Sequence, residues 1–454
     1  MQQTLFNKGQ AEQPSPGEVA AAQAIGGNPR LRVPQRNQVE IHWASLDELL
    51  EPDHPARMVW ACVCGLDLRR WLTTIKAVEG AAGRDATDPR LLVALWVYAT
   101  IEGVGSAREL ERLCEKHLAY QWLCGGVSVN YHLLASFRSL GSDAWDDLLT
   151  QIVASLLEQN LVTFKRVAQD GMRVRANAGA ASFRRRPRLD RFLAEAREQV
   201  EALKTLADES PEDATRRRHA ARKRASEERQ RRLEEAIRHC DELQQQREKT
   251  AKITGKKPIE ARASTTDPES RTMKFPDGGY RPGYNVQFST DTGSGIIVGV
   301  DVTNHGTDSE ELPPMLEQLE KRYGHPPEEA LVDGGFASLD AIDDAAQRGC
   351  TVYAPLKDKE KQLAAGKDPY APKRYDSEAV GSWRERMGTA AAKLVYSLRG
   401  RTAEWVNAIC RNRRLQQMSV RGREKCRMIA VLYAITHNIV RGVTLRTKAA
   451  ETGG

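Results

Sequence analysis

The order of extended and helical segments after residue 160 is the sequence feature that most restricts the possible folds. The run TFKRVAQDGMRVRANA, which starts at Thr163, carries β-branched residues at alternating positions and is typical of a strand. Helical runs separate the later members of a series of extended runs at 284–289, 295–302, 330–332 and 351–354. This order predicts a mixed sheet with helices on its faces.

The predicted α/β unit covers residues 160–441, and the ribonuclease H arrangement is one of the folds with such an order. Residues 183–262 interrupt it. Apolar residues there recur at steps of four and three, as in a heptad repeat, at Leu189, Leu193, Ala196 and Val200. A second series of this kind begins at Leu233. The pattern predicts a charged coiled-coil hairpin of two antiparallel helices, inserted into the sheet unit.

The region before the sheet, residues 41–155, has a helical pattern. Ser106-Ala-Arg-Glu109 is a capping box, and Asp88-Pro89 is typical of a helix start. We therefore expect an all-α N-terminal domain whose short helix 130–138 follows a turn, with Asn130 able to cap it.

Both ends of the chain lack a clear pattern. Residues 1–40 are polar and contain scattered Pro and Gly, so we expect an irregular arm. Residues 442–454 are expected to form a disordered tail.

Charge and cysteine usage limit the partners and the compartment only loosely. The chain has 68 Lys and Arg against 61 Asp and Glu, a net charge of +7, which is compatible with a polyanionic partner. Its eight cysteines form no Cys-x-x-Cys pair, which disfavours a structural zinc site and suits a reducing cytoplasm. The start of the chain does not resemble a signal peptide, and the apolar run 91–101 is too short to span a bilayer.

Acidic residues mark the ends of predicted elements. Asp170 ends or interrupts the first strand, Asp333 ends the strand 330–332, and Glu404 lies near the start of a predicted helix 401–414. Carboxylates brought together in this way favour Mg²⁺ or Mn²⁺, and two such ions can drive phosphodiester chemistry. The alternative is ordinary local structure, because Asp before Gly often forms turns and Glu favours a first helical turn.

Short segments throughout the chain are similar to one known family. Six of them occur in a consistent order, and they are spread over residues 40–441. They resemble the bacterial insertion-sequence transposases of the Asp-Asp-Glu (DDE) type. Two lie in the regions 47–138 and 420–441, and the others are VAQDGMRVRANA (167–178), TTDPESRTMK (265–274), ALVDGGFAS (330–338) and YSLRGRTAEWVNA (396–408).

The resemblance implies a ribonuclease H-like catalytic domain and a set of site residues. By this likeness Asp170, Asp333 and Glu404 are the catalytic acids and the ligands of two Mg²⁺ or Mn²⁺ ions. Tyr396 and Arg399 match the Tyr and Arg of a signature that ends in Glu404, and they are implied to contact DNA. Arg411 stands where the family usually has Lys, and it retains the charge for phosphate binding.

The implied function is metal-dependent DNA cleavage at the ends of the element, followed by strand transfer into target DNA. The partners would be the terminal inverted repeats and the target DNA. We expect a homodimer or higher oligomer in the bacterial cytoplasm, associated with the nucleoid and with no membrane. Two alternatives stay open: a metal-dependent nuclease without strand transfer, and an inactive relative that only binds DNA.

Two further regions have open interpretations. The helix 130–138 could place His132, Ser136 and Arg138 in a DNA groove, or the helical domain could be a scaffold. Asp267, in the segment TTDPES, could cap a loop or act as an additional carboxylate near the metal ions.

Overall fold

The computed structural model describes residues 43–78, 85–139, 141–208 and 213–452. The arm predicted at 1–40 lies outside these residues. All helices and strands described below belong to one structural unit that begins at Leu46.

Helices occupy the first part of this unit, and α5 (Pro89–Ile101) lies at their centre, with every residue from Leu91 to Thr100 buried. Local caps explain several helix starts, as the sequence predicted. The side chain of Asp88 accepts a hydrogen bond from the Arg90 amide at the start of α5. The Asn130 side chain accepts one from the Leu133 amide at the start of α8 (Tyr131–Ser139). The neighbouring helices are α2 (Leu46–Leu49), α3 (Pro55–Cys64), α4 (Arg69–Leu72), α6 (Ala107–Lys116), α7 (Leu118–Cys124) and α9 (Ser142–Glu158).

A mixed sheet follows, with the strand order β4-β5-β1-β7-β8 and with β6 paired to β5. The strand β5 runs antiparallel to β1, β4 and β6, whereas β1, β7 and β8 run parallel to one another. The predicted mixed α/β sheet is thus confirmed, and β4 is an addition to the predicted strands. The strands are β1 (Arg166–Arg175), β4 (Arg271–Lys274), β5 (Tyr280–Asp291), β6 (Ile297–Thr303), β7 (Glu329–Leu331) and β8 (Thr351–Tyr353).

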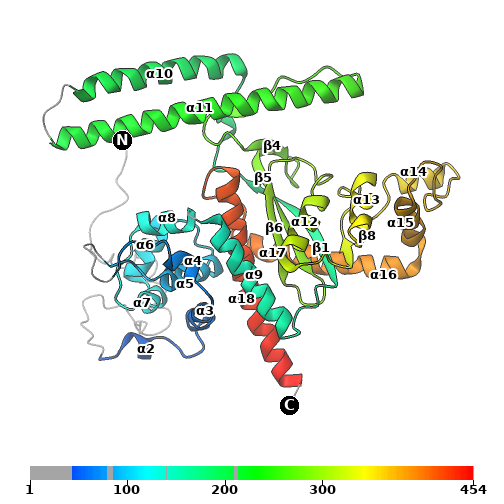
Figure 1. Ribbon diagram of the computed structural model, residues 1–454, viewed down its shortest axis with the longest axis horizontal. Coiled ribbons are helices and arrows are strands. Elements are labelled where there is room, and N and C mark those ends of the chain that lie inside the picture. The colour runs from blue at the N-terminus through cyan, green and yellow to red at the C-terminus, as the bar shows by residue number, and fades with distance from the viewer. Residues whose placement is uncertain (1–42, 79–84, 140, 209–212, 453–454) are drawn as a thin grey trace, which may run out of the picture. The chain divides into compact units, whose positions relative to one another are not determined.

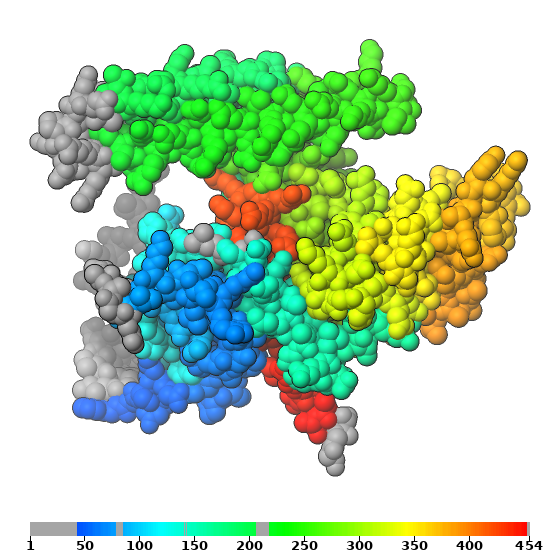
Figure 2. Space-filling model, in the orientation of Figure 1, coloured from blue at the N-terminus to red at the C-terminus, as the bar shows by residue number. Residues whose placement is uncertain are grey.

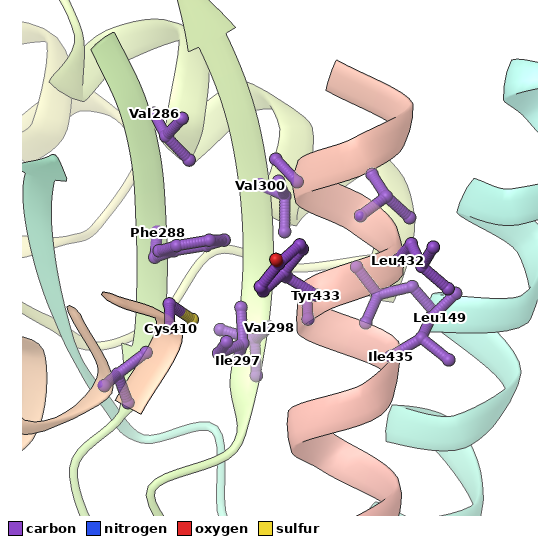
Figure 3. Close-up of a cluster of buried hydrophobic side chains, with 14 of the residues drawn as sticks. Leu149, Val286, Phe288, Ile297, Val298, Val300, Cys410, Leu432, Tyr433 and Ile435 are labelled. Carbon is purple, nitrogen blue, oxygen red and sulfur yellow. The ribbon is translucent and has the colours of Figure 1, made fainter. Parts of the chain in front are cut away.

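Apolar side chains of β5 and β6 pack against α17 (Trp405–Asn412) and the long helix α18 (Arg423–Thr452). Figure 3 shows Phe288 and Val300 of this layer together with Cys410 of α17 and Tyr433 of α18. Helix α12 (Leu312–Tyr323) also approaches β6, so closely that a side chain at Gly299 would overlap Met315. These contacts form a core beside β1, the central strand, and so fix the position of β1 relative to the C-terminal helices.

The inserted segment forms two long helices, α10 (Arg186–Asp208) and α11 (Asp213–Thr254), which lie side by side (Figures 1 and 2). Their contact is apolar, as the heptad pattern indicates, and includes buried Leu189, Leu193, Ala196, Leu233, Ala236 and Cys240. A two-stranded sheet of β2 (Phe183–Arg184) and β3 (Ala263–Ser264) closes the base of the insertion.

The C-terminal half differs from the sequence-based expectations in two places. Helix α18 continues to Thr452, so residues 442–452 are helical where we expected a disordered tail. Its length and composition would allow it to cross a membrane, but 72% of its most apolar window is buried inside the protein. The weakly patterned stretch after β8 contains α14 (Lys359–Ala364) and α15 (Glu378–Gly388), and α15 is anchored by buried Trp383, which no local periodicity predicted.

Candidate active site

The sheet register brings the first two acidic residues together. In the parallel pairing of β1 with β7, Ala168 is the partner of Leu331. Asp170 and Asp333 each lie two residues beyond this pair, so they occupy equivalent positions on neighbouring parallel chains. The negative charge of Asp333 acts on Asp170 and is one of the influences that raise the pKa of the Asp170 carboxyl.

Asp170 is mostly buried, and both of its carboxylate oxygens are bonded to side chains from the C-terminal helices. Nη2 of Arg399 donates to Oδ1 at 2.9 Å, and Nδ2 of Asn407 donates to Oδ2 at 3.0 Å. Burial is the largest influence on its pKa and raises it, whereas the charge of Arg399 lowers it. The net shift is upward, so the folded protein disfavours a charged Asp170 unless additional positive charge arrives.

This shift predicts how metal-free stability depends on pH. The unfolded chain has an Asp pKa of about 3.9, and the folded value is higher. The stability that Asp170 contributes is therefore fully present below the unfolded pKa and is lost as pH rises through the folded pKa. Asn cannot titrate, so the unfolding free energy of wild type minus that of Asp170→Asn should fall as pH rises. Urea unfolding of both proteins with a chelator tests this, and a difference that is constant or rises with pH would contradict it.

Glu404 reaches the site through a π-helical turn. This turn, Gly400–Glu404, joins α16 (Ala390–Arg399) to α17, where the sequence predicted a regular helix from residue 401. In a regular α-helix, residues five apart point about 140° away from each other. A π turn bonds residues five apart and so brings them to one side. Nη1 of Arg399 consequently lies 3.6 Å from Oε1 of Glu404.

The Arg399 guanidinium thus stands between two of the predicted catalytic acids. It contacts Asp170 with one nitrogen and Glu404 with another, and its own side chain is only 12% exposed. Glu404 is far more accessible, with 67% of its side chain exposed. A positive group between two carboxylates lowers their mutual repulsion, which is the electrostatic role that a metal ion would also fill.

The oxygen donors at this sheet edge fit a hard divalent cation. Asp170 and Asp333 present carboxylates from equivalent positions, and Asp333 is exposed, with Oδ1 accepting from the Gly335 amide of its own turn at 2.5 Å. Among the residues that the structure describes, no three His, Cys, Asp or Glu side chains are gathered closely enough to hold a metal. Asp170 and Asp333 present the carboxylates that would be available to such a cation here, and Glu404 is paired with Arg399.

Comparison with known proteins gives two family matches. The model described as "Transposase DDE domain" matches residues 251–439, which include Asp333 and Glu404. The model described as "Transposase domain (DUF772)" matches residues 44–140. The chain belongs to the DDE-type transposases of insertion sequences. Searches of curated proteins and of solved structures gave no match.

Family membership fixes the general chemistry of the site. DDE transposases are nucleic-acid-cleaving enzymes that act on DNA and generally use divalent metal ions. Asp170 and most of the helical hairpin lie outside both matched ranges, so the placement of Asp170 in the site rests on the sheet register and on its contacts with Arg399 and Asn407.

Tyr396 and Arg411 are both predicted to contact DNA, but the two side chains differ in burial. Tyr396 is half-buried beside the acids: burial raises its pKa, Arg399 lowers it, and the charges of Asp333 and Asp170 raise it. Arg411 is exposed at the end of α17. Part of the Tyr396 side chain and most of the Arg411 side chain are therefore accessible to a ligand.

The expectation for Arg138 was wrong. Its side chain is buried in the helical region, where the guanidinium stacks over Trp96 at 4.1 Å and Nη1 donates to the Gly105 carbonyl at 2.7 Å. Burial lowers its pKa to about 10. The side chain therefore stabilises the core of this region and cannot enter a DNA groove, whereas His132 and Ser136 of the same helix are exposed.

Asn407 was missed by sequence reasoning, and Asp267 lies in a buried hydrogen-bond network. Asn407 lies three residues after Glu404, a spacing that could have indicated a shared helix face, but an Asn in a helix has no specific signal. Asp267 is fully buried, and its Oδ1 accepts from the Tyr284 hydroxyl at 2.7 Å and from the Gly422 amide at 3.1 Å. It therefore fastens its loop to the start of α18, which favours the capping interpretation.

Proposed function

We propose that this transposase cuts DNA at the ends of its insertion sequence and joins the freed end to target DNA. The observation that carries the proposal is the equivalent placement of Asp170 and Asp333 on neighbouring parallel chains, with Arg399 linking Asp170 to Glu404. Hard carboxylate ligands at a partly open sheet edge suit phosphodiester chemistry with divalent ions.

We infer a ribonuclease H-like arrangement for the catalytic domain. The support is the strand order, in which β5 and β6 extend one side of β1 antiparallel and β7 and β8 extend the other side parallel. In this arrangement the central strand and its parallel neighbour both deliver acids to one sheet edge, and a C-terminal helix adds the third.

Asp170, Asp333 and Glu404 are proposed to hold two Mg²⁺ or Mn²⁺ ions. When bound, the ions supply Lewis-acid activation of the attacking oxygen and stabilise the leaving oxygen. Asn407 donates to Oδ2 of Asp170 and so orients this carboxylate. Arg399 balances the acids in the metal-free protein, and once it is displaced its planar guanidinium can bind a phosphate with two nitrogens.

The remaining assignments concern DNA binding and assembly. Tyr396 and Arg411 are proposed to contact DNA beside the cut, and the helical region to bind the element ends through the exposed His132 and Ser136 of α8. A transposase must hold two ends of one element, so we propose at least a homodimer.

Strand transfer distinguishes this proposal from a plain nuclease. With a labelled DNA duplex that carries an element end, and with Mg²⁺ or Mn²⁺, we expect the label to appear in products longer than the donor. These products arise when the freed 3′-hydroxyl attacks target DNA. The same reaction without target DNA and the reaction with a chelator are the controls. If only shortened fragments form in every condition, the protein is a metal-dependent nuclease.

A further inference from the structure

A groove lined by arginines lies at the end of β1, beyond the acidic residues. Its volume is about 400 Å³, and its charged lining consists of Arg173, Arg175, Arg281, Arg411 and Asp277. The arginines come from three separate elements: β1, β5 and α17. Of these arginines, only Arg411 belongs to the residues already predicted to contact DNA, so the charge of the other three needs an explanation.

The positive charge of the groove is largely uncompensated. Its single carboxylate, Asp277, is bonded to Arg281 at 2.6 Å. Arg175 and Arg411 have no side-chain hydrogen bond or ion pair with any residue that the structure describes. Arg173 donates through Nη2 to the Gly306 carbonyl at 2.8 Å, but its Nε is buried and has no partner in the described chain. Arginine stays charged at any working pH, so these groups repel one another until an anion binds.

The groove has a fixed position relative to the acids. Arg173 and Arg175 follow Asp170 on the same strand by about 10 and 17 Å, and their side chains leave the opposite face of β1 from that of Asp170. Arg411 follows Glu404 on the same helix by about 10 Å. The chain after α17 is hydrogen-bonded to the end of β1, through the Arg175 amide to the Gln416 carbonyl and the Met418 amide to the Arg175 carbonyl. These hydrogen bonds therefore hold the two sides of the groove at a fixed distance from the acidic residues.

We propose that this groove binds the phosphate backbone of the DNA strand that leads away from the cut phosphate. The inference rests on the proposed function and adds the path of the DNA. Arginine recognises phosphate with two parallel hydrogen bonds, and arginines from β1, β5 and α17 converge on this one groove. Arg281 is further held by Phe275, whose ring centroid lies 5.7 Å from its guanidinium carbon.

Salt-dependent DNA binding by the full-length protein tests the groove. The test variant is Arg175→Gln/Arg281→Gln, and the matched control Lys165→Gln/Lys321→Gln removes two exposed charges elsewhere on the same unit. Binding of a fluorescent DNA duplex is measured with a chelator at several salt concentrations. Each lost phosphate contact should reduce the magnitude of the slope of log K against log salt by about 0.9. The slope of the test variant should therefore be smaller in magnitude than that of wild type by about 1.8, and the variant should bind DNA about tenfold more weakly. Arg175→Lys/Arg281→Lys should keep most of the slope, because the charge remains.

The outcomes separate the groove from the reaction. A test variant with the wild-type slope and affinity would contradict DNA binding by the groove. An equal loss of slope and affinity in the Lys165/Lys321 control would also contradict it. Neither result bears on the reaction, which depends on cutting and strand transfer by the acidic site. If the wild-type protein joins no DNA but the slope changes as expected, the proposed reaction fails and the groove stands.

Discussion

Asp170→Asn is expected to reduce metal-dependent DNA cutting by at least about a thousandfold, since the variant loses the charge of one of the proposed metal ligands. Asp170 is bonded to α16 through Arg399 and to α17 through Asn407. Asn has the same shape but no charge, so it cannot offset the charge of a divalent cation. Strand transfer should fall with cutting, because both steps use the same acids.

The fold should survive this substitution. The Asn side-chain oxygen can still accept from Arg399. The Asn amide can donate to Oδ1 of Asn407, which is buried without a partner in the described chain, once the Asn407 amide turns over. Burial already disfavours the charge of Asp170, so removing this charge relieves a cost at neutral pH.

Nicking of an element-end duplex in Mg²⁺ and in Mn²⁺ measures the loss, with circular dichroism to check folding. Glu404→Gln is the companion variant: its side chain is 67% exposed, so it should lower cutting with almost no effect on stability. Near-normal cutting by folded Asp170→Asn would overturn the assignment of the site. Near-normal cutting by Glu404→Gln would remove only Glu404 from it.

Asp267→Ala is expected to destabilise the protein by about 2–4 kcal/mol, without touching the acidic site. The substitution leaves the fully buried Tyr284 without the acceptor for its hydroxyl, and an unsatisfied buried donor costs about 1–3 kcal/mol. It also removes the acceptor for the Gly422 amide at the start of α18. Loss of such a cap costs about 1 kcal/mol more.

Asp267→Asn separates this structural role from catalysis. Asn keeps an acceptor at Oδ1 and removes a charge that burial disfavours, so its stability should stay within about 1 kcal/mol of wild type. Both variants should cut DNA normally below their melting temperatures. Asp277→Ala, at an exposed Asp, is the control for the loss of a carboxylate. Urea unfolding gives the free energies, and equal stability of Asp267→Ala and wild type would refute the anchoring role.

Local sequence signals predicted the elements that depend on neighbouring residues. The caps at Asp88 and Asn130 formed as expected, because a capping side chain bonds an amide only two or three residues away. The apolar seam of the hairpin formed for a similar reason, since steps of three and four place side chains on one helix face. The extended runs became strands because alternating β-branched residues suit a half-buried pleated surface.

The sequence by itself also determined which acids are candidates, since Asp170, Asp333 and Glu404 all lie in segments that resemble the family. Only the tertiary structure decided how they meet. The β1–β7 register gives Asp170 and Asp333 equivalent positions two residues beyond its last pair, and the π turn brings Glu404 to Arg399. The burial of Arg138 also depends on distant residues, because its guanidinium contacts Trp96 and the Gly105 carbonyl, both far away in the sequence. Register and packing depend on contacts between distant residues, and no local pattern encodes these contacts.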